Sequence, residues 1–241
     1  MGSVGASASM GRVLLVCDDS IAIQHLSEGM QQLAIATEVC VDVSMALRSL
    51  NRKKFEAVII DLGLTEADQV LGQVRLSPSN RTAVTFAITD AGKAAKPELQ
   101  PNFMIERPLS AGSVGRILKA AFGLIVRERR RSFRCPTEIS ATLVTKAEEV
   151  NCRLVNISEG GLAITGSPAL KPGTQVRVLF RLPGQSPHFQ IEAEICWRDE
   201  IGRAGLRSLL IPSDQRPVLQ RWLAARLEED LPESVAQQFR K

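Results

Sequence analysis

The stretch E-R-R-R-S-F-R at residues 128–134 divides this sequence of 241 residues into two parts of different character. Before it, apolar runs alternate with helix-like patterns, which predicts a parallel sheet covered by helices on both faces. After it, short β-branched runs are separated by Gly, Pro and Asn, which predicts a small antiparallel barrel. The crowded guanidinium groups repel one another, so the stretch also indicates an anion or an acidic surface that neutralises them.

The charge distribution indicates a local anion site in the second part. Residues 1–126 carry 12 basic and 12 acidic residues, so the whole net charge of +4 belongs to the remainder. An excess this small does not suit a protein that coats nucleic acid. Aromatic residues make up only 4 % of the chain, and Tyr is absent, which argues against a broad base-stacking platform.

Cysteine usage and the chain start predict a cytoplasmic protein. The five cysteines are odd in number and form no CxxC pair, which is typical of reduced thiols and offers no zinc site. Residues 1–10 are small and polar, so we expect a disordered N-terminus and no signal peptide. No apolar run approaches the roughly 18 residues that a membrane span needs.

The first part predicts a five-stranded parallel sheet. The expected strands lie at residues 13–17, 37–43, 55–61, 84–89 and 103–106. The expected helices include one that places Ile23, Leu26, Met30 and Leu33 on one face, and others at residues 44–50, 66–74 and 110–126. Because the carboxyl ends of parallel strands meet at one crevice, the polar residues that follow them should converge. These residues are Asp18, Asp19, Asp61, Thr89 and Arg107.

These residues carry a resemblance to response-regulator receiver domains over residues 11–126, with a linker helix at the end. The resemblance implies a two-component signalling module with a flavodoxin-like fold. It implies that Asp18 and Asp19, with Asp61, hold Mg2+, since carboxylates gathered together suit a hard divalent ion. It further implies that Asp61 is the phosphoacceptor, and that Thr89 and Arg107 occupy the switch positions.

Three departures from that pattern predict a degenerate receiver used for packing or dimerisation. Arg107 stands before Pro108 where the family has Lys, and guanidinium is not interchangeable with ammonium. The loop at residues 62–66 lacks the usual Pro and later Gly. Residues 90–102 carry two prolines and no apolar stripe, so the usual fourth helix is expected to be short or missing. The alternative is a receiver that is phosphorylated.

The second part predicts an antiparallel barrel closed by a helix. The expected strands lie at residues 138–145, 152–157, 161–165, 175–182 and 189–197. The terminal helix carries an apolar face made of Val218, Leu219, Trp222, Leu223 and Leu227. We expect this face to pack on the barrel, and a homodimer contact is the alternative.

Two motifs in this part resemble those of the PilZ domain, with the likeness covering about residues 127–229 of a predicted domain at 127–241. Arg130 and Arg134 form an R-x-x-x-R, and residues 156–161 read N-I-S-E-G-G, an N-x-S-x-x-G. The resemblance implies cyclic di-GMP as the ligand. Its implied ligand-binding residues are Arg129, Arg130, Arg131, Arg134, Asn156, Ser158, Gly160 and Gly161. For Arg129 and Arg131 a solvated helix end is the alternative, because the helix dipole favours cations there.

The chemistry of these residues suits a cyclic dinucleotide. Guanidinium can fork onto phosphate oxygens or grip the O6/N7 edge of guanine. Asn156 offers a donor and an acceptor, Ser158 adds a hydroxyl, and Gly161 permits close backbone approach.

The sequence therefore predicts a bacterial-type signalling effector that binds cyclic di-GMP and acts on an unidentified downstream protein. No nucleophile–base pairing, P-loop or dinucleotide-binding glycine motif is recognisable, so no enzymatic turnover is expected. The main alternative is a phosphorylation-controlled response regulator whose second domain contacts a protein and ignores nucleotide. Binding of nucleic acid through the arginines is a third and weaker reading, because no recognition helix accompanies them.

Overall fold

The computed structural model describes residues 11–92, 100–185 and 188–229. These residues form two compact units that meet in the sequence between Arg129 and Arg130, the second ending at Glu229. The predicted disorder of residues 1–10 lies outside the described residues. So does the middle of the segment 90–102, although its described residues contain no helix.

The first unit is an α/β domain, as predicted. Its strands are β1 (Gly11–Val16), β2 (Ile35–Cys40), β3 (Ala57–Asp61), β4 (Val84–Thr89) and β5 (Phe103–Glu106). Its helices are α1 (Ser20–Gln32), α2 (Val43–Arg52), α3 (Ala67–Leu76) and α4 (Ala111–Ser132). The strands pair in parallel in the order β2-β1-β3-β4-β5. This is the flavodoxin-like doubly wound order, which places a crevice at the carboxyl ends of the central strands.

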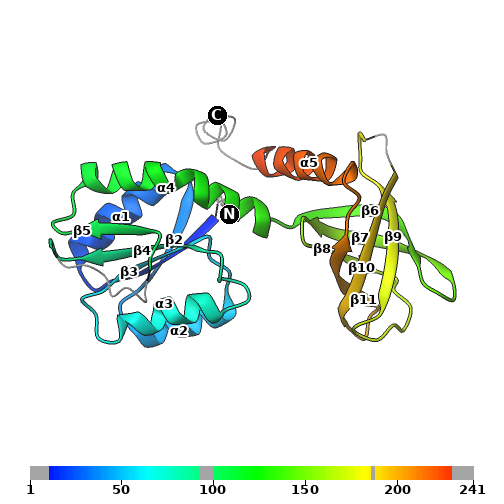
Figure 1. Cartoon of the computed structure of the whole chain (residues 1–241), viewed down its shortest axis with the longest axis horizontal. Coiled ribbons are helices and arrows are strands. Elements are labelled where there is room, and N and C mark those ends of the chain that lie inside the picture. The colour runs from blue at the N-terminus through cyan, green and yellow to red at the C-terminus, as the bar shows by residue number, and fades with distance from the viewer. Residues whose placement is uncertain (1–10, 93–99, 186–187, 230–241) are drawn as a thin grey trace, which may run out of the picture. The chain divides into compact units, whose positions relative to one another are not determined.

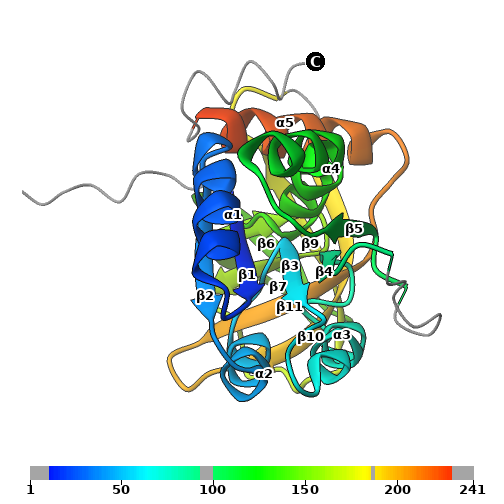
Figure 2. The same ribbon diagram turned by 90° about the vertical axis from the view of Figure 1, so that its left-hand side faces the viewer.

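Helices cover both faces of this sheet. Figures 1 and 2 show α1 and α4 on one face and α2 and α3 on the other. The core between the sheet and the α2–α3 face includes Leu14, Val58, Ile60 and Val70. Near-continuous apolar strands such as β3, buried at every position, are typical of a sheet covered on both faces.

Helix α4 extends six residues beyond the predicted end at residue 126. Ala121 and Ile125 are buried on one face of α4, and the next residue buried on that face is Glu128, which is only 4 % exposed. Glu128 accepts hydrogen bonds from Lys54 Nζ at 2.5 Å and Thr82 Oγ1 at 2.7 Å. Polar partners in the first unit thus hold the helix where apolar periodicity stops, and the pattern of apolar residues could not show this.

The second unit is a closed antiparallel barrel, also as predicted. Its strands are β6 (Cys135–Val144), β7 (Glu149–Ser158), β8 (Gly161–Thr165), β9 (Gln175–Arg181), β10 (His188–Arg198) and β11 (Arg203–Leu210). They close in the order β10-β11-β8-β7-β6-β9. Strand β11 was not among the expected strands, because its sequence R-A-G-L-R-S-L-L lacks a β-branched run.

Helix α5 (Gln215–Glu229) packs beside the barrel (Figure 1). Its buried side chains are Leu219, Trp222, Leu223 and Leu227, four of the five residues predicted for this face. The apolar face of α5 is therefore buried within the second unit, as the packing prediction expected. In the part of the chain that the structure describes, no helix combines the length and the apolar character needed to cross a membrane.

Candidate functional sites

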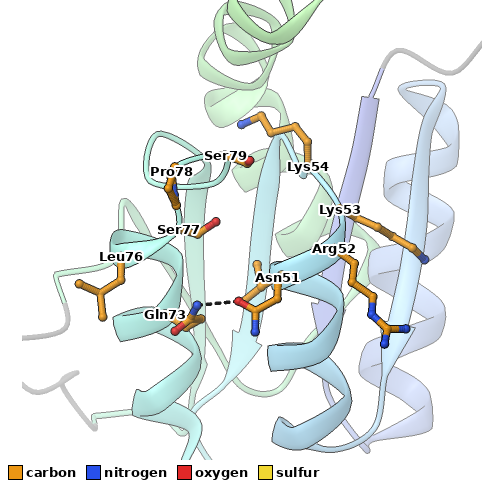
Figure 3. A pocket seen from close by; sticks show the side chains of 10 residues that line it. Asn51, Arg52, Lys53, Lys54, Gln73, Leu76, Ser77, Pro78 and Ser79 are labelled. Carbon is orange, nitrogen blue, oxygen red and sulfur yellow. Dashed lines mark hydrogen bonds between the residues drawn. The ribbon is translucent and has the colours of Figure 1, made fainter. Parts of the chain in front are cut away.

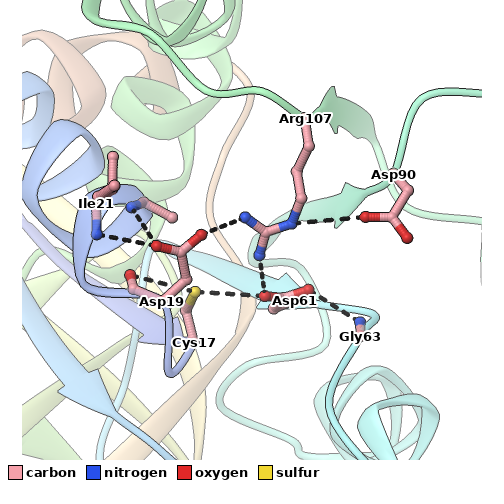
Figure 4. Close-up of polar contacts among 8 residues, drawn as sticks. Cys17, Asp19, Ile21, Asp61, Gly63, Asp90 and Arg107 are labelled. Carbon is pink, nitrogen blue, oxygen red and sulfur yellow. Dashed lines mark hydrogen bonds and ion pairs between the residues drawn. The ribbon is translucent and has the colours of Figure 1, made fainter.

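Three of the polar residues predicted to converge at the strand ends of the first unit, Asp19, Asp61 and Arg107, lie together (Figure 4). Arg107 reaches from the end of β5 into the crevice, where NH1 donates to Asp19 Oδ2 at 2.5 Å and NH2 donates to Asp61 Oδ2. Its Nε lies 3.9 Å from Asp90 Oδ1. The Thr89 hydroxyl donates to the carbonyl of Asp90 at 2.9 Å. The crevice is therefore an acidic pocket with a guanidinium inside it.

The two carboxylates bound by Arg107 are also engaged by the backbone. Asp19 Oδ1 caps α1 by accepting the N–H groups of Ile21 at 2.9 Å and Ala22 at 3.2 Å. These bonds, led by that of Ala22 and joined by Arg107, hold the pKa of Asp19 below its usual range. Asp61 is 4 % exposed, and its Oδ1 accepts the Gly63 N–H at 2.9 Å.

A cysteine thiol and an exposed carboxylate complete the acidic pocket. Cys17 is buried and its Sγ lies 3.5 Å from Asp61 Oδ2. Burial, reinforced by the Asp61 carboxylate, raises the pKa of this thiol to about 11, so it stays protonated near neutral pH. Ligand atoms of Cys17, Asp18 and Asp61 all lie within 4.8 Å of one another. Asp18 itself is exposed.

The second unit contains a cleft of about 500 Å³ at one side of the barrel. Its lining includes four residues predicted to bind ligand, namely Arg134, Asn156, Gly160 and Gly161. Other lining residues come from β10 and β11, namely Cys196, Trp197, Gly205, Leu206 and Arg207. The cleft thus joins residues separated by more than 70 positions in the sequence.

Two β-bulges lie beside residues that line this cleft. On β7, Leu154 pairs with Ile164 and Asn156 with Ala163, so Val155 is an extra residue. On β10, Ile195 pairs with Leu206 and Trp197 with Gly205. A bulge of this kind redirects the residues beside it, and here it precedes Asn156 and Trp197. No described residue donates a hydrogen bond to the buried Oδ1 of Asn156.

Two glycines of the cleft, Gly161 and Gly205, leave no room for a side chain. A Cβ atom at Gly161 would lie 2.2 Å from the carbonyl oxygen of Leu206, so β8 and β11 could not approach as they do. A Cβ atom at Gly205 would lie 2.1 Å from Nε1 of Trp197. The indole therefore lies against the backbone of β11, and it is 49 % exposed. Neither Trp197 nor Gly205 was among the ligand-binding residues predicted from the sequence.

The predicted ligand residue Ser158 has an internal partner. Its side chain is 4 % exposed, and its hydroxyl donates to the carbonyl of Gly161 at 3.0 Å. This bond spans the turn between β7 and β8. In this structure Ser158 therefore stabilises the hairpin that carries Asn156, and it is not among the residues that line the cleft.

The arginines at the unit junction separate into different environments. Arg129 is half-buried, and its NH1 lies 3.8 Å from Oε1 of Glu56, a carboxylate that is 2 % exposed. Arg130 and Arg131 belong to the last turn of α4 and do not line the cleft. Arg134 follows the helix, is exposed, and lines the cleft.

A further pocket of about 230 Å³ lies between α2 and α3 in the first unit (Figure 3). Three consecutive cations, Arg52 to Lys54, line it and would suggest an anion site. However, Lys53 Nζ pairs with Glu38 at 2.8 Å and Lys54 Nζ pairs with Glu128 at 2.5 Å. Because both ammonium groups are paired with carboxylates that do not line the pocket, the pocket does not present a cluster of available cations.

Comparisons with known proteins agree with this two-unit architecture. Residues 128–225 match the profile of the PilZ domain family. No curated protein sequence matches the chain. A solved structure of the Bacillus subtilis inhibitor of motility is 20 % identical over 39 % of this chain, with a TM-score of 0.34. The match spans 48 % of that protein, about half its length.

Two further solved structures each correspond to one of the units. The receiver domain of a sensor histidine kinase from Pseudomonas aeruginosa, which has a magnesium ion in its active-site cleft, is 20 % identical. That match covers 47 % of this chain and 98 % of the receiver domain, with a TM-score of 0.42. A PilZ domain of CeSA from a cellulose-synthesizing bacterium is 21 % identical over 39 % of this chain and 97 % of its own, with a TM-score of 0.33. Residues 128–225 of this chain are a PilZ domain, and they follow a unit with the receiver fold.

Proposed function

We propose that this protein is a signalling effector that binds cyclic di-GMP in the cleft of its second unit. One observation carries the proposal: Arg134, Asn156 and Trp197 line a single cleft, although they come from three separate parts of the chain. A volume of about 500 Å³ is within the range of small-molecule sites in proteins.

Each of these groups has a counterpart on the ligand. The exposed guanidinium of Arg134 can bind a phosphate or the O6/N7 edge of guanine. The Asn156 side chain lines the cleft and carries an amide that can hydrogen-bond to a base edge. The half-exposed Trp197 indole offers a face for a purine to stack upon. Arg207 is a second cation of the cleft, although its NH2 lies 3.2 Å from Glu194.

The remaining residues predicted to bind ligand have different roles in this proposal. Gly160 and Gly161 line the cleft near the β7–β8 turn, and Ser158 holds that turn together. Arg130 supplies the first arginine of the motif from the end of α4, and Arg131 is its exposed neighbour. Arg129 acts in the first unit with Glu56, so we assign it no role in ligand binding.

In this proposal the first unit is a degenerate receiver, and the protein acts without catalytic turnover on a downstream protein. Its five cysteines are free thiols, which suits the cytoplasm. The rival function is control by phosphorylation, in which a phosphoryl group passes from a donor to the Asp61 carboxylate. Treatment with acetyl phosphate and Mg2+, followed by intact-mass measurement, addresses this rival. An adduct that is lost in Asp61→Asn would favour the rival.

Calorimetric titration of the full chain with cyclic di-GMP tests the proposal. The linear dinucleotide and a short DNA duplex serve as controls for ring closure and for charge alone. We expect saturable binding of the cyclic dinucleotide, weaker binding of the linear form and none of the duplex. Equal affinity for all three would indicate a general anion site, and no binding of the cyclic form would refute the proposed function.

A further inference from the structure

The receiver resemblance implies Mg2+ among Asp18, Asp19 and Asp61, but the residues present do not fit that ion. Mg2+ demands near-octahedral oxygen coordination and usually takes one or two carboxylates directly. Here Arg107 already takes one oxygen from Asp19 and one from Asp61. The second oxygen of Asp19 caps α1, and the second oxygen of Asp61 accepts the Gly63 N–H. All four oxygens of these two carboxylates are therefore engaged by the protein itself.

The position of the guanidinium is fixed at both ends of the side chain. The backbone N–H of Arg107 donates to the carbonyl of Thr89 at 2.8 Å, which holds the start of the side chain beside β4. At the other end, NH1 and NH2 point to different carboxylates, as Figure 4 shows. A planar fork with separate donors can join two acids in this way, whereas the compact ammonium of lysine is a single point charge.

The buried carboxylate of the acidic pocket has a cation partner without a metal. Asp61 is almost fully buried, and a buried carboxylate needs a cation or several hydrogen bonds. Burial by itself would lower the pKa of Arg107, but its bonds to Asp19 and Asp61 outweigh that effect and raise it. The guanidinium thus remains charged, and a divalent ion entering the same space would meet electrostatic repulsion as well as occupied ligands.

We infer that Arg107 is the resident counter-ion of the acidic pocket and that it excludes divalent cations from Asp19 and Asp61. The inference concerns the first unit alone and does not depend on nucleotide binding by the second. If Arg107 excludes the ion, a substitution of Arg107 should confer Mg2+ binding on the first unit. Replacing Arg107 should release the carboxylate oxygens and create a Mg2+ site that the natural chain lacks.

Titration of the full chain with MgCl2 tests the inference, with heat and the backbone amide resonances of Asp61 and Gly63 as readouts. The variants are Arg107→Lys, which keeps a positive charge, and Arg107→Ala, which removes it. Arg116→Lys is the matched control, because Arg116 is an exposed arginine of α4 in the same unit. Circular dichroism establishes that each variant is folded.

The wild type and Arg116→Lys are expected to show no saturable change at Asp61 and Gly63. Both Arg107 variants should gain affinity for Mg2+ by at least about tenfold, and adding Asp61→Asn to either should abolish the gain. Saturable Mg2+ binding by the wild type that disappears in Asp61→Asn would overturn the inference. Failure of both folded variants to gain affinity would overturn it equally. Should neither variant fold, the wild-type titration still tests the inference. Saturable Mg2+ binding at Asp61 would overturn it, and its absence would support it.

Discussion

The acidic pocket of the first unit and the cleft of the second place the same functional group in opposite situations. In the acidic pocket, the Arg107 guanidinium contacts two carboxylates of its own chain. In the cleft, the Arg134 guanidinium is exposed, and no described carboxylate pairs with it. An arginine already neutralised by the fold acts as a structural element, whereas one without a carboxylate is available for an external anion.

The arginines at the junction show the same contrast within a few residues. Arg129 faces the buried carboxylate of Glu56, and Arg134 faces the cleft. A cluster that looks uniform in sequence therefore has at least two roles. The comparison predicts that substitutions in the acidic pocket change stability, whereas substitutions in the cleft change ligand affinity.

The largest expected effect is on stability in the acidic pocket. Arg107→Ala leaves Asp61 buried without its cation, which should lower the free energy of unfolding of the first unit by about 2–3 kcal/mol. Arg134→Ala removes an exposed side chain and should change stability by less than about 0.5 kcal/mol. Urea unfolding in the absence of Mg2+ measures the free energy of unfolding of both variants. Because both Trp residues, Trp197 and Trp222, lie in the second unit, their fluorescence should follow the barrel in either variant, and circular dichroism should reveal the loss in the first unit.

Similar stability losses in both variants would break the comparison, since Arg134 would then have a structural partner. An Arg107→Ala protein as stable as the parent would show that the acidic pocket does not need its guanidinium.

The next effect is on affinity in the cleft. Arg134→Ala should weaken binding of cyclic di-GMP by roughly tenfold to a hundredfold, because a charge-assisted hydrogen bond contributes about 1.5–3 kcal/mol. Arg130→Ala should weaken it less, since Arg130 does not line the cleft. Arg153→Ala is the matched control, an exposed arginine of β7 whose NH1 lies 3.8 Å from Glu138. Equal affinities for Arg134→Ala and Arg153→Ala would remove Arg134 from the site.

A smaller effect is expected at Asn156. Asn156→Ala removes a neutral hydrogen-bonding group, so affinity should fall by about 1 kcal/mol, roughly fivefold. Asn151→Ala provides the control on the same strand, where Asn151 is exposed and outside the cleft. Calorimetry on both variants makes the comparison. An Asn156→Ala protein that binds like Asn151→Ala would mean that the bulge on β7 does not direct Asn156 to the ligand.

The general architecture of both units was predictable from the sequence, whereas the details that build the sites were not. Alternating apolar runs and the Asp18–Asp19, Asp61 and Arg107 positions predicted the sheet and its acidic crevice correctly. The bond from Arg107 to Asp61 spans 46 residues and depends on a side-chain conformation, which periodicity cannot reveal. The bulges before Asn156 and Trp197 arise from strand register, and no local pattern marks them. The extension of α4 depends on Glu128 finding Lys54, a contact across 74 positions.

The smallest expected effect is the protection of a thiol. Cys196 is exposed and lines the cleft, so iodoacetamide should modify it first at pH 8, and cyclic di-GMP should slow that reaction severalfold. Cys152 is the internal reference, because burial raises its pKa to about 11 and keeps it protonated at that pH. Its modification should be slow and unaffected by ligand. Peptide mass mapping follows both sites, and unchanged labelling of Cys196 would place the ligand elsewhere.

The most direct test of the central claim uses the two tryptophans of the chain, followed through their indole N–H resonances during titration of the full chain with cyclic di-GMP. Trp197 lines the cleft, whereas Trp222 is only 8 % exposed and lies on the buried face of α5. The proposed function predicts a saturable shift of the Trp197 resonance, assigned by Trp197→Phe, with little change at Trp222 and at the Asp61 and Gly63 amides. A shift confined to Asp61 and Gly63, or none at Trp197 under saturating ligand, would contradict a nucleotide site in this cleft.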